Sequence, residues 1–194
     1  AINAEYNDAM DETVQRLEKE EGLTGVIFAS AKKVFFAGAD LNELVLMDEN
    51  GSEELFANGE FIKGHFRRLE KLPVPVVAAI NGAALGGGYE LSLACNHRIA
   101  FNHKSVQIGL PECAIGVYPA GGGVVRLTKL IGVEKALDII LKSQRLTPEK
   151  ALAGGLIDEV VESIDDLLPR ARAWISENVD NKEAIAQPWD RKGY

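Results

Sequence analysis

Residues 81–90 read Asn-Gly-Ala-Ala-Leu-Gly-Gly-Gly-Tyr-Glu, and they follow a run of five apolar residues, Val76–Ile80. This run predicts a buried strand. After the Asn-Gly turn, the three glycines at 86–88 lead into a helix expected from Tyr89 to about Ala94. Backbone N–H groups at a helix N-terminus lack intrahelical acceptors, so they can stabilise an anion or a developing oxyanion. The alternative is that the glycines only let the helix pack closely on the sheet.

Two nucleotide-binding motifs do not fit this stretch. A P-loop needs a lysine after its last glycine, and none is present here. The glycines also lack the G-x-G-x-x-G spacing of a dinucleotide-binding turn, and no acidic residue follows at a strand end about 20 residues on.

Outward from this stretch, predicted strands and helices alternate along the chain, which indicates an α/β fold. The strands are expected over 25–29, 76–80, 98–101, 106–108 and 156–161, and the helices over 5–21, 41–47, 53–72, 89–94, 124–131, 134–142, 147–154 and 165–178.

The composition is that of an ordinary globular protein, with 194 residues, 46% hydrophobic content and a net charge of −8. The acidic balance argues against a nucleic-acid partner held by global charge. No apolar run approaches the length of a membrane span. The two cysteines, Cys95 and Cys113, provide neither a disulfide scaffold nor a structural zinc set, and we expect buried free thiols in a reducing, cytoplasmic compartment.

Two glutamates are candidates for general acid/base chemistry. Glu90 falls in the first turn of the helix after the glycines, where a carboxylate gains from the helix dipole. Glu112 is the only charged residue between Lys104 and Arg126, in a glycine-rich apolar stretch. Two carboxylates beside a backbone oxyanion site suggest work on a carbonyl compound. The alternatives are a dipole-matching surface residue at 90 and an exposed loop residue at 112.

A second tight turn, Ala37-Gly38-Ala39-Asp40, ends another apolar run and is a candidate source of a second oxyanion N–H. Its alternative is a simple strand-to-helix turn capped by Asp40.

Four ordered motifs resemble those of the crotonase superfamily, and most closely the hydratase region of multifunctional fatty-acid β-oxidation proteins. They are FFAGADL at 35–41, AAINGAALGGGYELSLAC at 78–95, IGLPECAIGVYPAGGGVVRL at 108–127 and LTPEKALAGGLIDEVV at 146–161. The resemblance implies a spiral of ββα units with helices packed outside.

It also implies roles for single residues. The oxyanion hole would use the backbone N–H groups of Ala39 and Gly87, and the catalytic pair would be Glu90 and Glu112. Ala37, Asp40, Leu41 and Gly86 would help to bind the coenzyme A thioester.

The implied reaction is addition of water across the C2=C3 bond of a 2-enoyl-CoA. Glu90 would activate the water and Glu112 would supply the proton to C2. No metal or other cofactor is expected, because coenzyme A is part of the substrate. Two alternatives remain: a Δ3–Δ2-enoyl-CoA isomerase, for which one carboxylate suffices, and an inactive crotonase-fold subunit that serves in structure or binding.

We expect residues 1–178 to form the hydratase domain without its first strands, and 179–194 to be a connector towards a downstream region, such as the dehydrogenase of a bifunctional hydratase/3-hydroxyacyl-CoA dehydrogenase. Trp189, a large apolar residue in a polar tail, predicts that this segment packs against something. The implied protein partners are further copies of the chain or, in a β-oxidation complex, a thiolase subunit.

Overall fold

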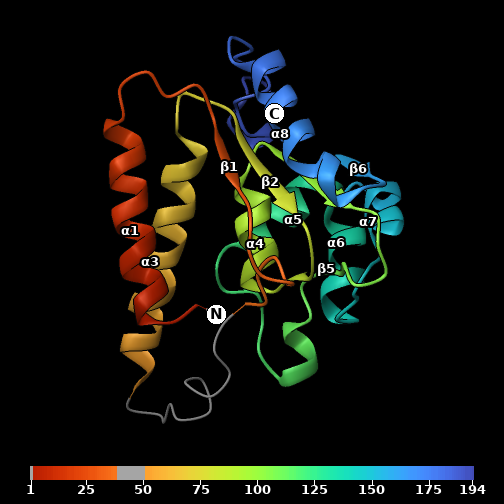
Figure 1. Cartoon of the computed structure of the whole chain (residues 1–194). Helices are drawn as coiled ribbons and strands as arrows, with labels where there is room; N and C mark the ends of the chain where they lie inside the picture. Colours follow the sequence, from red (N-terminus) through yellow and green to blue (C-terminus); the bar gives the residue numbers. More distant parts are fainter. Residues whose placement is uncertain (1, 39–50) are drawn as a thin grey trace.

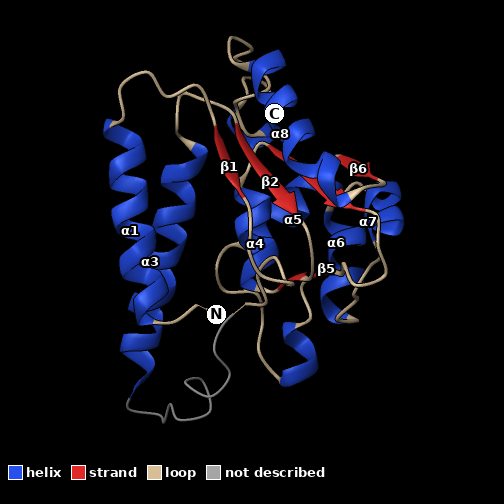
Figure 2. Cartoon of the chain, viewed as in Figure 1, coloured by secondary structure: helices blue, strands red, loops and turns tan. Residues whose placement is uncertain are grey.

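A four-stranded parallel sheet forms the centre of the computed structural model, which describes residues 2–38 and 51–194 except for the side chains of 54 and 55. Its strand order is β1 (Val26–Phe28), β2 (Val76–Ile80), β4 (His97–Phe101) and β6 (Glu159–Val161). A second, two-stranded parallel sheet joins β3 (Ala84–Leu85) to β5 (Ile108–Gly109). Helices surround both sheets (Figure 2).

The alternation of strands and helices expected from the sequence is confirmed. The helices are α1 (Ala4–Lys19), α3 (Ser52–Glu70), α4 (Gly87–Ala94), α5 (Gly123–Ile131), α6 (Val133–Leu141), α7 (Pro148–Gly154) and α8 (Ile164–Asn178), with short 3₁₀ helices at Glu112–Ile115 and Pro188–Asp190. Figure 1 shows α1 and α3 side by side along one flank of the molecule. The helix expected over 41–47 lies outside the described residues.

The strand expected over 106–108 is placed differently, because β5 begins only at Ile108. The N–H of Val106 instead donates to the carbonyl of His103 at 2.9 Å, so the chain is still turning there. The turn carries the chain from the large sheet to the small one.

The all-apolar sequence of β2 follows from burial on both faces of the sheet. Val77 and Ala79 pack in a cluster with side chains of α8, whereas Val76, Ala78 and Ile80 belong to the larger core, shared with α1, α3 and α4. All five residues are buried. A strand covered on both faces needs no polar alternation, which is why the run could be recognised as a parallel-sheet strand.

Backbone elements approach each other closely at Gly88, in the first turn of α4. A Cβ added there would lie 1.9 Å from the carbonyl oxygen of Phe36. The prediction that the glycines permit close packing is therefore correct for Gly88. The anion-stabilising role of the helix start at Gly87 stays a prediction.

The C-terminal segment docks on its own domain. The Asn96 side-chain amide donates to the carbonyl of Ile185 at 3.0 Å, and the buried Gln187 donates to the last turn of α4, at the carbonyl of Ala94, at 2.9 Å. Asp190 pairs with Arg67 of α3. The neighbouring Trp189 is half-buried, as its apolar character predicted.

Among the described residues, no helix is both long and apolar enough to cross a bilayer.

Candidate active site

Two glycine turns from distant parts of the sequence meet at the start of α4. Gly38 has φ +88°, and a Cβ added to it would lie 3.4 Å from the backbone nitrogen of Gly87 and 3.2 Å from the carbonyl oxygen of Leu85. Gly86 turns the chain with φ +56°, and its N–H donates to the carbonyl of Gly109 at 3.0 Å. The structure therefore brings together the two backbone segments that the sequence proposed for an oxyanion hole.

Gly87 is the first residue of α4, so its N–H has no acceptor within the helix. Ala37 is exposed and directly precedes the Gly38 turn. Ala39, Asp40 and Leu41 lie outside the described residues, and their predicted roles stay predictions.

Glu112 begins the 3₁₀ helix and faces the same turn. A Cβ added at Gly86 would lie 2.9 Å from its Oε1. Its Oε2 is buried and has no hydrogen-bond partner among the described residues, and burial raises the pKa of this carboxyl. The alternative of an exposed loop glutamate is excluded. A buried carboxyl oxygen without a protein partner is costly, and this is typical of a group that is satisfied by a ligand.

Glu90 is only 3% exposed, so the alternative of a surface glutamate is wrong. The N–H of Gly123, at the start of α5, donates to its Oε1 at 2.7 Å. Burial raises the pKa of Glu90 to about 7, against the lowering effect of the Gly123 N–H, and the charge of Glu112 adds to the increase. A carboxyl that titrates near neutrality is suited to take up and release a proton at working pH.

The raised pKa of Glu90 predicts a pH-dependent stability difference. Between about pH 4.5 and 7 the unfolded chain has released this proton while the folded chain still holds it, so the free energy of unfolding falls as the pH rises. Glu90→Gln removes this loss. We expect the variant to gain stability over wild type by up to the order of 3 kcal/mol above pH 7, with no such gain below about pH 4.5.

Urea denaturation across this pH range measures the difference. Glu12→Gln, a change at an exposed position of α1, is the matched control and is expected to show no pH-dependent gain. A constant offset between Glu90→Gln and wild type at every pH would contradict the raised pKa.

Sequence reasoning missed two charged residues behind the site. Arg126 of α5 and Glu70 of α3 are 7% and 4% exposed and form an ion pair with an Nε–Oε1 distance of 2.5 Å. A signal was present for each. Arg126 follows two valines at the start of an apolar helix, and Glu70 continues the buried face of Phe66 and Leu69.

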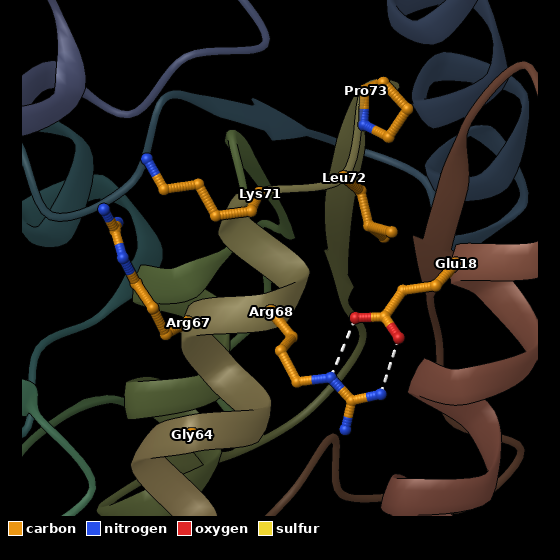
Figure 3. Close-up of a pocket in the computed structure, with 7 residues that line it drawn as sticks. All are labelled: Glu18, Gly64, Arg67, Arg68, Lys71, Leu72 and Pro73. Atoms are coloured by element: carbon orange, nitrogen blue, oxygen red, sulfur yellow. Dashed lines mark hydrogen bonds and ion pairs between the residues drawn. The ribbon is translucent and has the colours of Figure 1, made fainter.

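A cleft between α1 and α3 is a separate feature, and neither glutamate of the site lines it. Across this cleft, the guanidinium of Arg68 donates two hydrogen bonds to the carboxylate of Glu18, at 2.8 and 2.6 Å (Figure 3). Arg67 and Lys71 leave α3 on the other side and pair with Asp190. The charged side chains that line the cleft are already paired with protein groups.

Within the described ranges, His, Cys, Asp and Glu form no group of three or more able to hold a metal ion.

Comparison with known proteins identifies the class. The family model for enoyl-CoA hydratase/isomerase matches residues 1–189. Among solved structures, an enoyl-CoA hydratase from Bacillus anthracis has a TM-score of 0.83 and 35% identity, covering 93% of this chain and 68% of that one. One from Thermoplasma volcanium has a TM-score of 0.78 and 32% identity, covering 95% of this chain and 70% of that one. The chain belongs to the enoyl-CoA hydratase/isomerase family and has the crotonase fold.

Curated relatives are more specific. The fatty acid oxidation complex subunit alpha of a Psychrobacter species (strain PRwf-1) is 44% identical over 166 residues, or 86% of this chain. The protein of the same name from Shewanella loihica is 42% identical over 84% of it. The chain spans 23% of the length of each of these two relatives.

Proposed function

We propose that the chain hydrates 2-enoyl-CoA thioesters in fatty-acid β-oxidation, as the hydratase part of a multifunctional protein. The observation that carries the proposal is the convergence of two carboxyls, the buried Glu90 and the half-buried Glu112, on the turn before α4. Glu112 lies against Gly86, and Glu90 sits in the first turn of the same helix. The family and the names of the relatives support the choice of substrate.

The first requirement of the reaction is a place for negative charge on the thioester oxygen. C3 of a 2-enoyl thioester is electrophilic only when this oxygen can accept charge. The N–H groups of Gly87 and Ala39 would donate to it, each stabilising the enolate-like transition state by roughly 3 kcal/mol.

The two carboxyls then divide the proton transfers. Ionised Glu90 takes a proton from a water molecule as the water oxygen bonds to C3. Protonated Glu112 gives its proton to C2. Burial favours the neutral form of Glu112, so it holds a proton to donate. Exchange of one proton between the carboxyls, through water, restores the starting state. No further cofactor takes part, because coenzyme A enters as part of the substrate.

Two relatives are named as alpha subunits of a fatty acid oxidation complex. We therefore propose that this chain also works within such an assembly, alongside a thiolase subunit, and that its parent protein carries a 3-hydroxyacyl-CoA dehydrogenase activity.

Incubation of the purified chain with crotonyl-CoA tests the central proposal. We expect loss of the conjugated enoyl absorbance and formation of the 3-hydroxyacyl thioester. Tight binding of the thioester without turnover would instead support the alternative of an inactive binding subunit.

A further inference from the structure

The loop that contacts Glu90, Gly121–Gly123, is itself held by Arg126. Its Nη1 donates to the carbonyl of Gly121 at 3.0 Å, and the guanidinium lies against the next residue of the loop. A Cβ at Gly122 would lie 2.1 Å from Nη1, and Gly122 has φ +102°. Both the backbone conformation and the space under the turn therefore require glycine at 122.

Arg126 is in turn fixed by α3. Its Nε donates to Oε1 of Glu70, and its guanidinium carbon lies 5.8 Å from the centre of the Phe66 ring. The other oxygen of Glu70 accepts from Arg67 at 2.6 Å. With both carboxylate oxygens of Glu70 engaged, the guanidinium has one well-defined position.

The same loop contacts Glu90 at two points. Gly123 donates its N–H to Oε1, and a Cβ at Gly121 would lie 2.6 Å from Oε2. A shift of the loop would therefore change both the hydrogen bond to Glu90 and the space around its carboxylate.

We propose that Arg126, held by Glu70, is a positioning residue that fixes the Gly121–Gly123 loop against Glu90 and so sets the geometry and the charge state of this carboxylate. The expected effect of Arg126 on kcat rests on the proposed function, whereas its expected effect on the Glu90 carboxylate does not. A buried ion pair is weak evidence for a stabilising role, because desolvation offsets much of the attraction. The contact of Arg126 with the loop that touches Glu90 explains the buried ion pair better than a stabilising role does.

The charged groups that act on Glu90 are Glu112, which raises its pKa, and Arg126, which lowers it. Removing Arg126 takes away a positive charge and loosens the Gly123 donor. Both changes raise the pKa of Glu90, so the sign of the expected effect does not depend on which is larger.

Arg126→Met and Glu70→Gln test the proposal in two ways. We expect kcat for crotonyl-CoA hydration to fall by about tenfold to a hundredfold with little change in KM, because the binding groups are untouched. The acid limb of the kcat profile should move to higher pH by about half a unit or more in Arg126→Met. Arg126→Lys should recover the pH profile more than kcat, since an ammonium keeps the charge but not the planar fork.

Arg98→Met is the matched control. Arg98 is also a buried arginine, 4% exposed, and it donates to the carbonyl of Cys95 at 2.9 Å and pairs with Asp158 at 2.7 Å. Its contact with Cys95 lies at the C-terminal end of α4, whereas the glycines lie at the start of that helix. We expect its loss to lower stability without moving the acid limb.

Carbon-13 NMR of the glutamate carboxyls, with the Glu90 signal assigned from Glu90→Gln, reads the same titration without turnover. A higher pKa in Arg126→Met but not in Arg98→Met is the expected result. An unchanged Glu90 titration in both Arg126→Met and Glu70→Gln would overturn the positioning role, even if stability falls. Failure of the wild-type chain to hydrate crotonyl-CoA would overturn the proposed function alone.

Discussion

Glu112→Gln should reduce the hydration rate by about 10²–10⁴-fold while leaving affinity for the thioester nearly unchanged. The amide has nearly the same shape as the carboxyl, Oε1 lies beside Gly86, and Oε2 has no hydrogen-bond partner among the described residues. In the proposed mechanism, the substitution removes the proton that Glu112 gives to C2. The rate of crotonyl-CoA hydration and the dissociation constant of a non-reactive acyl-CoA are the two measurements.

Glu134→Gln on the exposed side of α6 is the control, with an expected rate equal to wild type. Retention of more than about a tenth of the wild-type turnover by Glu112→Gln, a loss of less than about 1.4 kcal/mol, would show that this residue is not the acid.

Glu90→Gln should separate hydration from isomerisation. Only hydration needs an activated water, whereas moving a double bond needs one group to carry a proton between carbons. We expect hydration to fall by about 10²–10⁴-fold and isomerisation of a 3-enoyl-CoA by less than about tenfold. Both rates are measured on one preparation, with the fold checked by circular dichroism.

Equal losses in the two reactions, with the fold intact, would contradict separate roles for the two carboxyls. The comparison also decides between the hydratase and the isomerase alternative. A wild-type chain that isomerises but does not hydrate would favour the isomerase.

Local sequence pattern was enough to predict most of the elements and both carboxyls. β2 could be recognised because both of its faces are buried, and Glu112 because it is a lone charge in an apolar stretch. Neither signal depends on knowing what lies across the fold. The resemblance implied that Ala39 and Gly87 lie together; the structure brings the adjacent Gly38 close to Gly87, although 49 positions separate these two glycines in the sequence.

Features that depend on contacts between distant segments escaped prediction. The sequence marks Arg126 as unusual but does not say that its partner is Glu70, on another helix. The contacts of the C-terminal segment were also predicted only in part. Trp189 predicted docking, but the partners of the segment, among them Arg67 of α3, could be found only from the structure.

The close backbone approaches around the site also restrict how it can change during evolution. Cβ atoms at Gly82, Gly88 and Gly109 would come within 2.3, 1.9 and 2.1 Å of carbonyl oxygens of other segments. Because the obstacle is main chain rather than a flexible side chain, no other amino acid fits without displacing a strand or turn. Adaptation must therefore come from other residues around the site, while these three positions remain glycine in any descendant that keeps the same approach of the backbone segments.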